Sequence, residues 1–215
     1  TAETINPYLV KYGAINEVLD INKHKNFLKE LQLFDELPKV EVSSDKYHVS
    51  DIEYISGGNT EFSDASLGFG IVNITPDADA ILRRIPIVSE VDGMLAPHFS
   101  LRLLAAHADW ELKNMELKNN QKLILLDFPI EGVKKDIEIP LDDDGNMLIN
   151  YISRDKIKDQ MEAKEFQVIS ALKILESQTP PDLSGKIVLF GDHSIATSDI
   201  SYTPMDISSY NPLIF

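Results

Sequence analysis

Residues 186–194, Lys-Ile-Val-Leu-Phe-Gly-Asp-His-Ser, are the stretch that decides the fold class of this chain. Residues 187–190 contain no polar side chain, and the run ends at Gly191. A half-exposed strand alternates apolar with polar residues, whereas a strand covered on both faces is apolar throughout. Because strands covered on both faces are typical of parallel sheets flanked by helices, the run predicts an α/β domain. We expect a mixed, partly parallel sheet with helices on both faces.

Hydrophobic spacing predicts the other elements around this run. Apolar residues at Phe99, Leu103, Ala106 and Trp110 are spaced by four, three and four, which predicts a helix with Pro97 in its first turn. Two further helical regions are predicted over 14–36 and 163–176, the second with Val168, Leu172 and Leu175 facing inward. Strands are predicted over 40–55, 68–74, 81–88 and 123–128, and a hairpin pairs 137–141 with 147–151 across the turn 142–146.

Composition and charge exclude several classes of partner. The chain has 215 residues, a length that fits a single domain over 1–215. Its 20 basic and 35 acidic side chains give a formal net charge of −15. Such a charge repels a phosphate backbone and an anionic membrane surface, so we expect no nucleic acid partner. No apolar run approaches the ~20 residues that cross a bilayer. The absence of an initiating Met and the apolar end predict a piece excised from a longer protein.

The sequence lacks the usual signatures of catalysis and metal binding. It has no cysteine, which excludes thiolate metal sites, thiol nucleophiles and disulfides. A phosphate-binding loop, a dinucleotide fingerprint, a nucleophile elbow and a zinc helix are also missing. The acidic stretch 142–144 before Gly145 does not fit a calcium loop in any register, so a hairpin turn is favoured there. We therefore expect no catalytic residue, metal or cofactor.

Polar side chains follow the apolar run at the place where α/β sheets bind ligands. Ligands lie beyond the carboxyl ends of strands, and Gly191 would let the chain turn sharply there. The candidate ligand-binding residues in this region are Asp192, His193, Ser194, Asp199 and Thr203. The alternative is purely structural: Gly191 makes a turn, Asp192 or Ser194 caps a helix, and His193 is half-exposed.

Arg83 and Arg84 complete the set of candidate ligand-binding residues. On a strand, neighbouring side chains point to opposite faces, so one of the two lies buried or in a cleft. There it could hold the anion of a ligand or a carboxylate of the chain, such as Asp77 or Asp79. Of these two uses, the internal ion pair is favoured.

Three stretches together resemble a known family. They are 68–86 (Gly-Phe-Gly-Ile-Val-Asn-Ile-Thr-Pro-Asp-Ala-Asp-Ala-Ile-Leu-Arg-Arg-Ile-Pro), 145–151 (Gly-Asn-Met-Leu-Ile-Asn-Tyr) and 186–204, from Lys-Ile-Val-Leu-Phe-Gly to Thr-Pro. Their order and spacing resemble the second type of CHASE domain, a sensor found on bacterial receptors. The resemblance covers residues 62–204. Residues 1–61 show no opening strand with an acidic tip, so Thr1 begins inside the domain or the start has diverged.

The resemblance implies a sensory function outside the inner membrane. It implies a periplasmic domain, attached through flanking membrane helices to a cytoplasmic output domain such as a nucleotide cyclase, a kinase or a cyclic-dinucleotide enzyme. The partners would be a small molecule or protein ligand and a second copy of the receptor. The fragment itself would not be an enzyme.

The sequence departs from the family pattern at a few positions. Ala80 stands where the family usually has Gly, and Asp192 and His193 replace small residues. The alternative function is a soluble α/β enzyme or small-molecule binding protein that uses residues 191–193. There His193 would act as acid or base and Asp199 would orient it.

Overall fold

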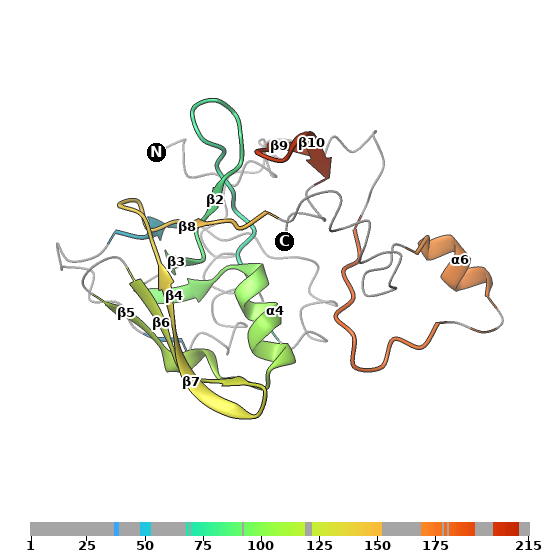
Figure 1. Ribbon diagram of the computed structural model, residues 1–215, viewed down its shortest axis with the longest axis horizontal. Helices are drawn as coiled ribbons and strands as arrows, with labels where there is room; N and C mark the ends of the chain where they lie inside the picture. The colour runs from blue at the N-terminus through green and yellow to red at the C-terminus, as the bar shows by residue number, and fades with distance from the viewer. Residues whose placement is uncertain are drawn as a thin grey trace, which may run out of the picture. The chain divides into compact units, whose positions relative to one another are not determined.

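The computed structural model describes residues 37–38, 48–52, 68, 70–91, 93–118, 122–151, 169–177, 179, 181–191 and 200–210. The chain divides into two compact units. The first comprises residues 1–75 and 84–148, and the second comprises 76–83 and 149–215. Figure 1 shows the elements of both units along the chain. In the part of the chain that is described, no helix is long and apolar enough to span a bilayer.

The described residues of the first unit form three small sheets. Its elements are β1 (Ser50–Asp51), β2 (Arg84–Ile85), β3 (Val88–Val91), β4 (Met94–Pro97), α4 (Phe99–His107), the 3₁₀ turn η3 (Leu112–Asn114), β5 (Met115–Lys118), β6 (Lys122–Ile130), β7 (Val133–Pro140) and β8 (Met147–Leu148). The strand orders are β1-β3-β4, β2-β8 and β5-β6-β7. β1 runs parallel to β3, whereas the other pairs in this unit are antiparallel. The predicted mixed, partly parallel α/β class is therefore confirmed.

The buried apolar side chains of the first unit lie on α4 and on the strands before and after it, and Ile52, Val91 and Ala96 form one core cluster. α4 buries Leu101 and Ala105, and β6 buries Leu123 and Leu125. Trp110 follows α4 and donates from its indole nitrogen Nε1 to the carbonyl oxygen of Leu126 at 2.8 Å. Its ring lies 5.3 Å, centroid to centroid, from that of Phe128. Trp110 therefore packs in the core, as predicted, although it lies beyond the end of α4. The rest of the predicted helix face is wrong, because α4 buries Leu101 and Ala105 and leaves Ala106 exposed.

Two glycines in the first unit allow backbone segments to approach closely. A Cβ atom on Gly70 would lie 2.3 Å from Cα of Phe99. This contact accompanies a parallel bridge of Ile71 with His98, in which Ile71 donates to the carbonyl of Pro97 and accepts from Phe99. A Cβ on Gly145 would lie 2.3 Å from the carbonyl oxygen of His48. Both positions therefore require the absence of a side chain.

The second unit contains α6 (Ala171–Glu176), β9 (Ile200–Thr203) and β10 (Asp206–Tyr210). β9 and β10 pair antiparallel, and Ile81 forms a parallel bridge with Tyr202. Leu82 is completely buried, and its amide donates to the carbonyl of Tyr202 at 2.7 Å. The segment around Leu82 is thus joined to β9.

Several predicted boundaries and pairings are wrong, and each has a physical reason. Pro97 ends β4 instead of opening the helix, and His98 is the N-cap of α4. The predicted strand 81–88 is divided into β2 and β3, since Pro86 between them has no amide hydrogen to continue a ladder. β8 pairs with β2, so the predicted pairing of 137–141 with 147–151 is wrong although the turn between them forms.

The largest correction concerns the apolar run 187–190. It is not a strand, and its side chains are 42–89% exposed. Leu172 and Leu175 of α6, predicted to face inward, are 60% and 83% exposed. An apolar run can be buried only where other segments cover it, and the sequence of the run does not specify those segments. Helices on both faces of the sheet are not confirmed. The predicted helix 14–36, residues 163–168 and most of the predicted strand 40–55 lie outside the described residues.

Candidate functional site

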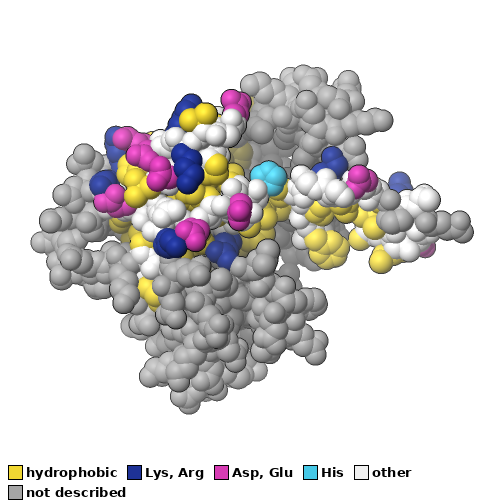
Figure 2. All heavy atoms as spheres, turned by 90° about the horizontal axis from the view of Figure 1, so that it is seen from below, with side chains coloured by type: hydrophobic (Ala, Val, Ile, Leu, Met, Phe, Trp, Pro, Cys, Tyr) yellow, Lys and Arg dark blue, Asp and Glu magenta, His cyan; other side chains and the backbone are white. Residues whose placement is uncertain are grey.

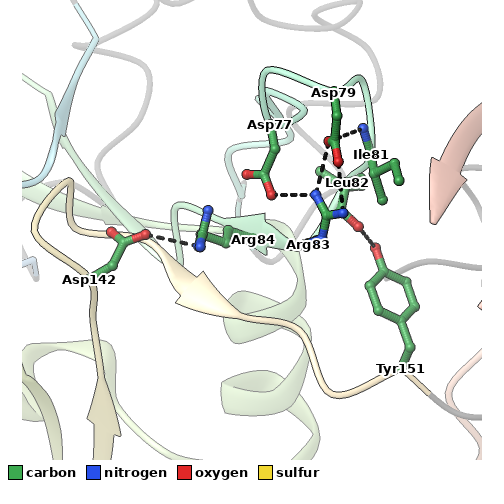
Figure 3. A network of polar contacts seen from close by, with 8 residues as sticks. All are labelled: Asp77, Asp79, Ile81, Leu82, Arg83, Arg84, Asp142 and Tyr151. Carbon is green, nitrogen blue, oxygen red and sulfur yellow. Dashed lines mark hydrogen bonds and ion pairs between the residues drawn. The ribbon is translucent and has the colours of Figure 1, made fainter. Parts of the chain in front are cut away.

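The best-defined cluster of polar side chains surrounds Arg83 in the second unit. The chain turns at residues 77–81, where the amide of Ala80 donates to the carbonyl of Asp77 at 2.8 Å and the amide of Asp77 donates to the carbonyl of Ile81 at 3.0 Å. The Asp79 carboxylate accepts from the amide of Ile81 at 3.1 Å. These bonds direct Asp77 and Asp79 toward the guanidinium group of Arg83 (Figure 3).

The guanidinium group of Arg83 binds both carboxylates. Nη1 and Nη2 donate to the two oxygens of Asp79 at 2.9 Å and 2.8 Å, and Nη1 also donates to Asp77 at 2.8 Å. The Arg83 side chain is 32% exposed. Paired donors on a planar guanidinium match a carboxylate well, so this arrangement is rigid. The predicted internal ion pair of Arg83 is confirmed.

The ion pairs shift the protonation equilibria in this cluster. The hydrogen bond from Arg83, together with that from the Ile81 amide, lowers the pKa of Asp79 from 3.8 to about 2. In turn, the hydrogen bonds to Asp79 and Asp77 raise the pKa of Arg83. Asp79 and Arg83 therefore both stay charged over the physiological pH range.

The backbone at Leu82 and Arg83 is held by a further segment of the same unit, residues 149–151. The hydroxyl of Tyr151 donates to the carbonyl of Leu82 at 2.7 Å, and the amide of Ile149 donates to the carbonyl of Arg83 at 2.9 Å. Burial raises the pKa of Tyr151 to about 12, so its hydroxyl remains a donor. The turn 77–81 is therefore attached to residues 149–151 as well as to β9.

Arg84 belongs to the first unit and interacts with a different carboxylate. Its Nε atom lies 3.3 Å from Oδ2 of Asp142, while Oδ1 of Asp142 accepts from the amides of Asp144 and Asn146 at 3.1 Å and 2.8 Å. Asp142 thus organises the turn between β7 and β8, as the favoured turn interpretation predicts. Among the described residues, no group of three acidic or histidine side chains could hold a metal ion.

The structure locates three of the seven candidate ligand-binding residues. Arg83 and Thr203 lie in the second unit, where Thr203 is 5% exposed at the end of β9. Arg84 lies in the first unit. The remaining candidates lie outside the described residues and stay predictions: Asp192, His193, Ser194 and Asp199.

Sequence reasoning missed two contributors to these clusters. Tyr151 is part of the stretch 145–151, and a Tyr that ends such an apolar stretch can donate to a buried carbonyl. Asp142 is the partner of Arg84 as well as a residue of the predicted turn. Neither contact has a signal in local spacing, because both join segments that are far apart in the sequence.

Comparison with known proteins gives one match. The model of the CHASE2 domain family matches residues 4–214, which is nearly the whole chain. The match includes the turn 77–81, the segment 149–151 and β9. Searches of curated proteins and of solved structures returned no match.

Proposed function

The chain belongs to the CHASE2 family of extracytoplasmic sensor domains of signalling receptors, and from this premise we propose that it is the periplasmic sensory domain of a bacterial inner-membrane receptor. The observation that supports the proposal is the family match over residues 4–214. Domains of this family are sensory and not catalytic, so the binding of a ligand or partner would be the event that the domain reports.

The chemistry around Arg83 restricts the ligands that this region could bind. Two carboxylates already neutralise the Arg83 guanidinium, so an anionic ligand would have to displace Asp77 or Asp79. The net charge of −15 also disfavours polyanions. We therefore propose a small polar or cationic solute, or a protein with basic side chains, as the ligand.

Transmission of the signal would use a dimer with two arrangements. A ligand can shift the equilibrium between them only by its different affinity for the two. We propose that the receptor is a homodimer in which membrane helices next to this domain connect it to a cytoplasmic output domain. That output domain would be a nucleotide cyclase, a kinase or a cyclic-dinucleotide enzyme.

The gene that encodes this chain tests the proposal directly. We expect apolar segments of ~20 residues next to the domain, and a cytoplasmic signalling domain after them. A coding sequence that contains neither would overturn the proposed receptor, while leaving membership of the family intact.

A further inference from the structure

The pairing of β1 with β3 brings two acidic residues side by side in the first unit. The two strands run parallel, and Asp51 is directly opposite Glu90. Neighbouring strands lie about 4.8 Å apart, and opposite residues of a ladder point to the same face of the sheet. Two carboxylates therefore face each other across this ladder. Like charges that are directly opposite each other destabilise the pairing of their strands.

No basic side chain is paired with either of these carboxylates among the residues that the structure describes. Other described carboxylates have such a partner; for example, Glu116 accepts from Lys118. Figure 2 shows Lys and Arg side chains, in dark blue, beside acidic side chains, in magenta, at several places on the described surface. The strands paired with β3 are β1 and β4, and on the β4 side Glu90 is opposite the apolar Leu95. Asp92 lies outside the described residues.

The surroundings of Glu90 favour its protonated form. Glu90 is partly buried, and burial raises the pKa of its carboxyl group, which the negative charge of Asp51 raises further. The folded-state pKa is therefore above the usual value of 4.5. A group of this kind contributes stability that is fully present below pH 4.5 and is lost as the pH rises through the folded-state pKa. The pairing of β1 with β3 is thus stronger in acid than at neutral pH.

The ladder of β1 is short, so a change of one charge has a large effect on it. β1 has two residues, and directly after it the amide of Ile52 donates to the carbonyl of Glu90 at 2.9 Å. Ile52 is 5% exposed and belongs to the core cluster with Val91 and Ala96. Release of β1 from β3 would therefore break this hydrogen bond and expose part of the cluster to water.

We propose that Asp51 and Glu90 form a proton-linked switch, in which a proton bound between the two carboxylates fastens β1 to β3 and its loss loosens β1. The proton comes from solvent and returns to it, and no other bond is made or broken. A proton that binds the fastened state more tightly shifts the balance toward that state. The use of this switch in signalling would rest on the proposed sensory function, whereas the switch itself does not.

Exchange of the Ile52 amide with solvent reports the pairing, because this amide donates to the carbonyl of Glu90. Its rate is measured by NMR on the 215-residue chain at a series of pH values from about 5 to about 7.5. Each rate is divided by that of an unstructured peptide of the same local sequence, which gives a protection factor. The variants are Glu90→Gln and Asp51→Asn, with Glu116→Gln as the matched control. The amide of Trp110, which is not part of this sheet, is the control within each sample.

We expect the protection factor of Ile52 to rise about fivefold from the upper to the lower end of this pH range, both in the unsubstituted chain and in Glu116→Gln. In Glu90→Gln the factor should be high throughout and independent of pH, because the amide side chain carries no charge. Asp51→Asn should raise the factor at neutral pH, because it removes the repulsion.

Three results would overturn the switch. The first is a protection factor of Ile52 that does not change with pH in the unsubstituted chain. The second is a pH dependence that persists in Glu90→Gln, or an Asp51→Asn variant without added protection at neutral pH. The third is an equal change at Trp110, which would mean that the whole unit opens. None of these results bears on the receptor proposal, because the measurement needs no membrane segment.

Discussion

His98 combines a structural role with a titratable ring. The residue is completely buried, and its Nδ1 atom accepts from the amide of Ser100 at 3.2 Å as the N-cap of α4. Burial lowers the pKa of His98 from 6.5 to about 4. Because the folded-state pKa is the lower one, His98 contributes stability above pH 6.5 that is lost as the pH falls toward about 4.

We predict that the free energy of unfolding decreases by up to ~3 kcal/mol over this pH range because of His98. The variant His98→Asn keeps a side-chain acceptor at the N-cap but cannot titrate, so it should lose most of this pH dependence. The control variant is His107→Asn, at the exposed end of the same helix, and it should keep the pH dependence of the unfolding free energy. Urea unfolding at a series of pH values measures the effect, and an unchanged acid slope in His98→Asn would contradict the assignment.

Ala80 adopts a backbone conformation that suits glycine. Its φ angle is +65°, in the left-handed region, and it lies in the turn that directs Asp77 and Asp79 to Arg83. A non-glycine residue pays roughly 1–2 kcal/mol there. Because glycine has no Cβ and avoids this cost, it would fit position 80 better than the alanine of this sequence.

We predict that Ala80→Gly stabilises the protein, by up to ~1 kcal/mol once the greater entropy of the unfolded glycine chain is subtracted. Ala78→Gly is the matched control, because Ala78 lies in the same turn without a positive φ angle. That control should be destabilised. Thermal unfolding compares the two variants, and a lower melting temperature for Ala80→Gly would show that the turn is not strained.

At the scale of elements, the turn between β7 and β8 depends on the absence of a side chain at Gly145. Gly145 and Gly132 have nearly the same φ angle, +80° and +79°. A Cβ on Gly145 would clash with the backbone of His48 and Val49, whereas a Cβ on Gly132 would meet nothing within 4 Å. An alanine at Gly132 would therefore cost backbone strain alone, whereas an alanine at Gly145 would cost strain and steric overlap together.

We predict that Gly132→Ala costs about 1 kcal/mol, for backbone strain alone. Gly145→Ala should cost a further ~1–3 kcal/mol, because the neighbouring segment must move. Urea unfolding monitored by the fluorescence of Trp110, the single tryptophan of the chain, measures both. Equal costs for the two variants would mean that residues 48–49 do not lie against this turn.

Local pattern predicted the elements that depend on near neighbours. The spacing of apolar residues correctly predicted a helix at α4 but not its buried face, which is formed by Leu101 and Ala105. The acidic residues before Gly145 correctly predicted a turn. Strand partners were not predictable, because β8 could pair with β7 or with β2 and only long-range packing decides between them. For the same reason, the apolar character of residues 187–190 wrongly predicted a buried strand, because burial depends on segments that the run does not specify.

For the candidate site, the sequence predicted the ion pair of Arg83 but not the distant segment that holds the neighbouring backbone. Asp77 and Asp79 are close to Arg83 in the chain, so their contact follows from a short turn. The bond from Tyr151 to the carbonyl of Leu82 joins residues 69 positions apart, and no local pattern reports such a contact.

At the scale of the whole molecule, buried and exposed apolar residues are unevenly distributed. Among the described residues, every buried apolar side chain except that of Leu82 lies in the first unit. Most of the exposed large apolar side chains lie in the second unit. We therefore expect the described part of the first unit, which buries more apolar side chains, to open less readily than that of the second.

The central claim is that the domain works outside the inner membrane, and labelling of the full-length protein in cells tests it most directly. Lys135→Cys places a thiol at an exposed position of β7, in a stretch of 215 residues without cysteine. Cells with a permeabilised outer membrane are treated with a maleimide that cannot cross the inner membrane. The full-length protein without the substitution and a cytoplasmic thiol protein are the controls. We predict that the variant is labelled while the inner membrane is intact, and labelling only after lysis would contradict the account.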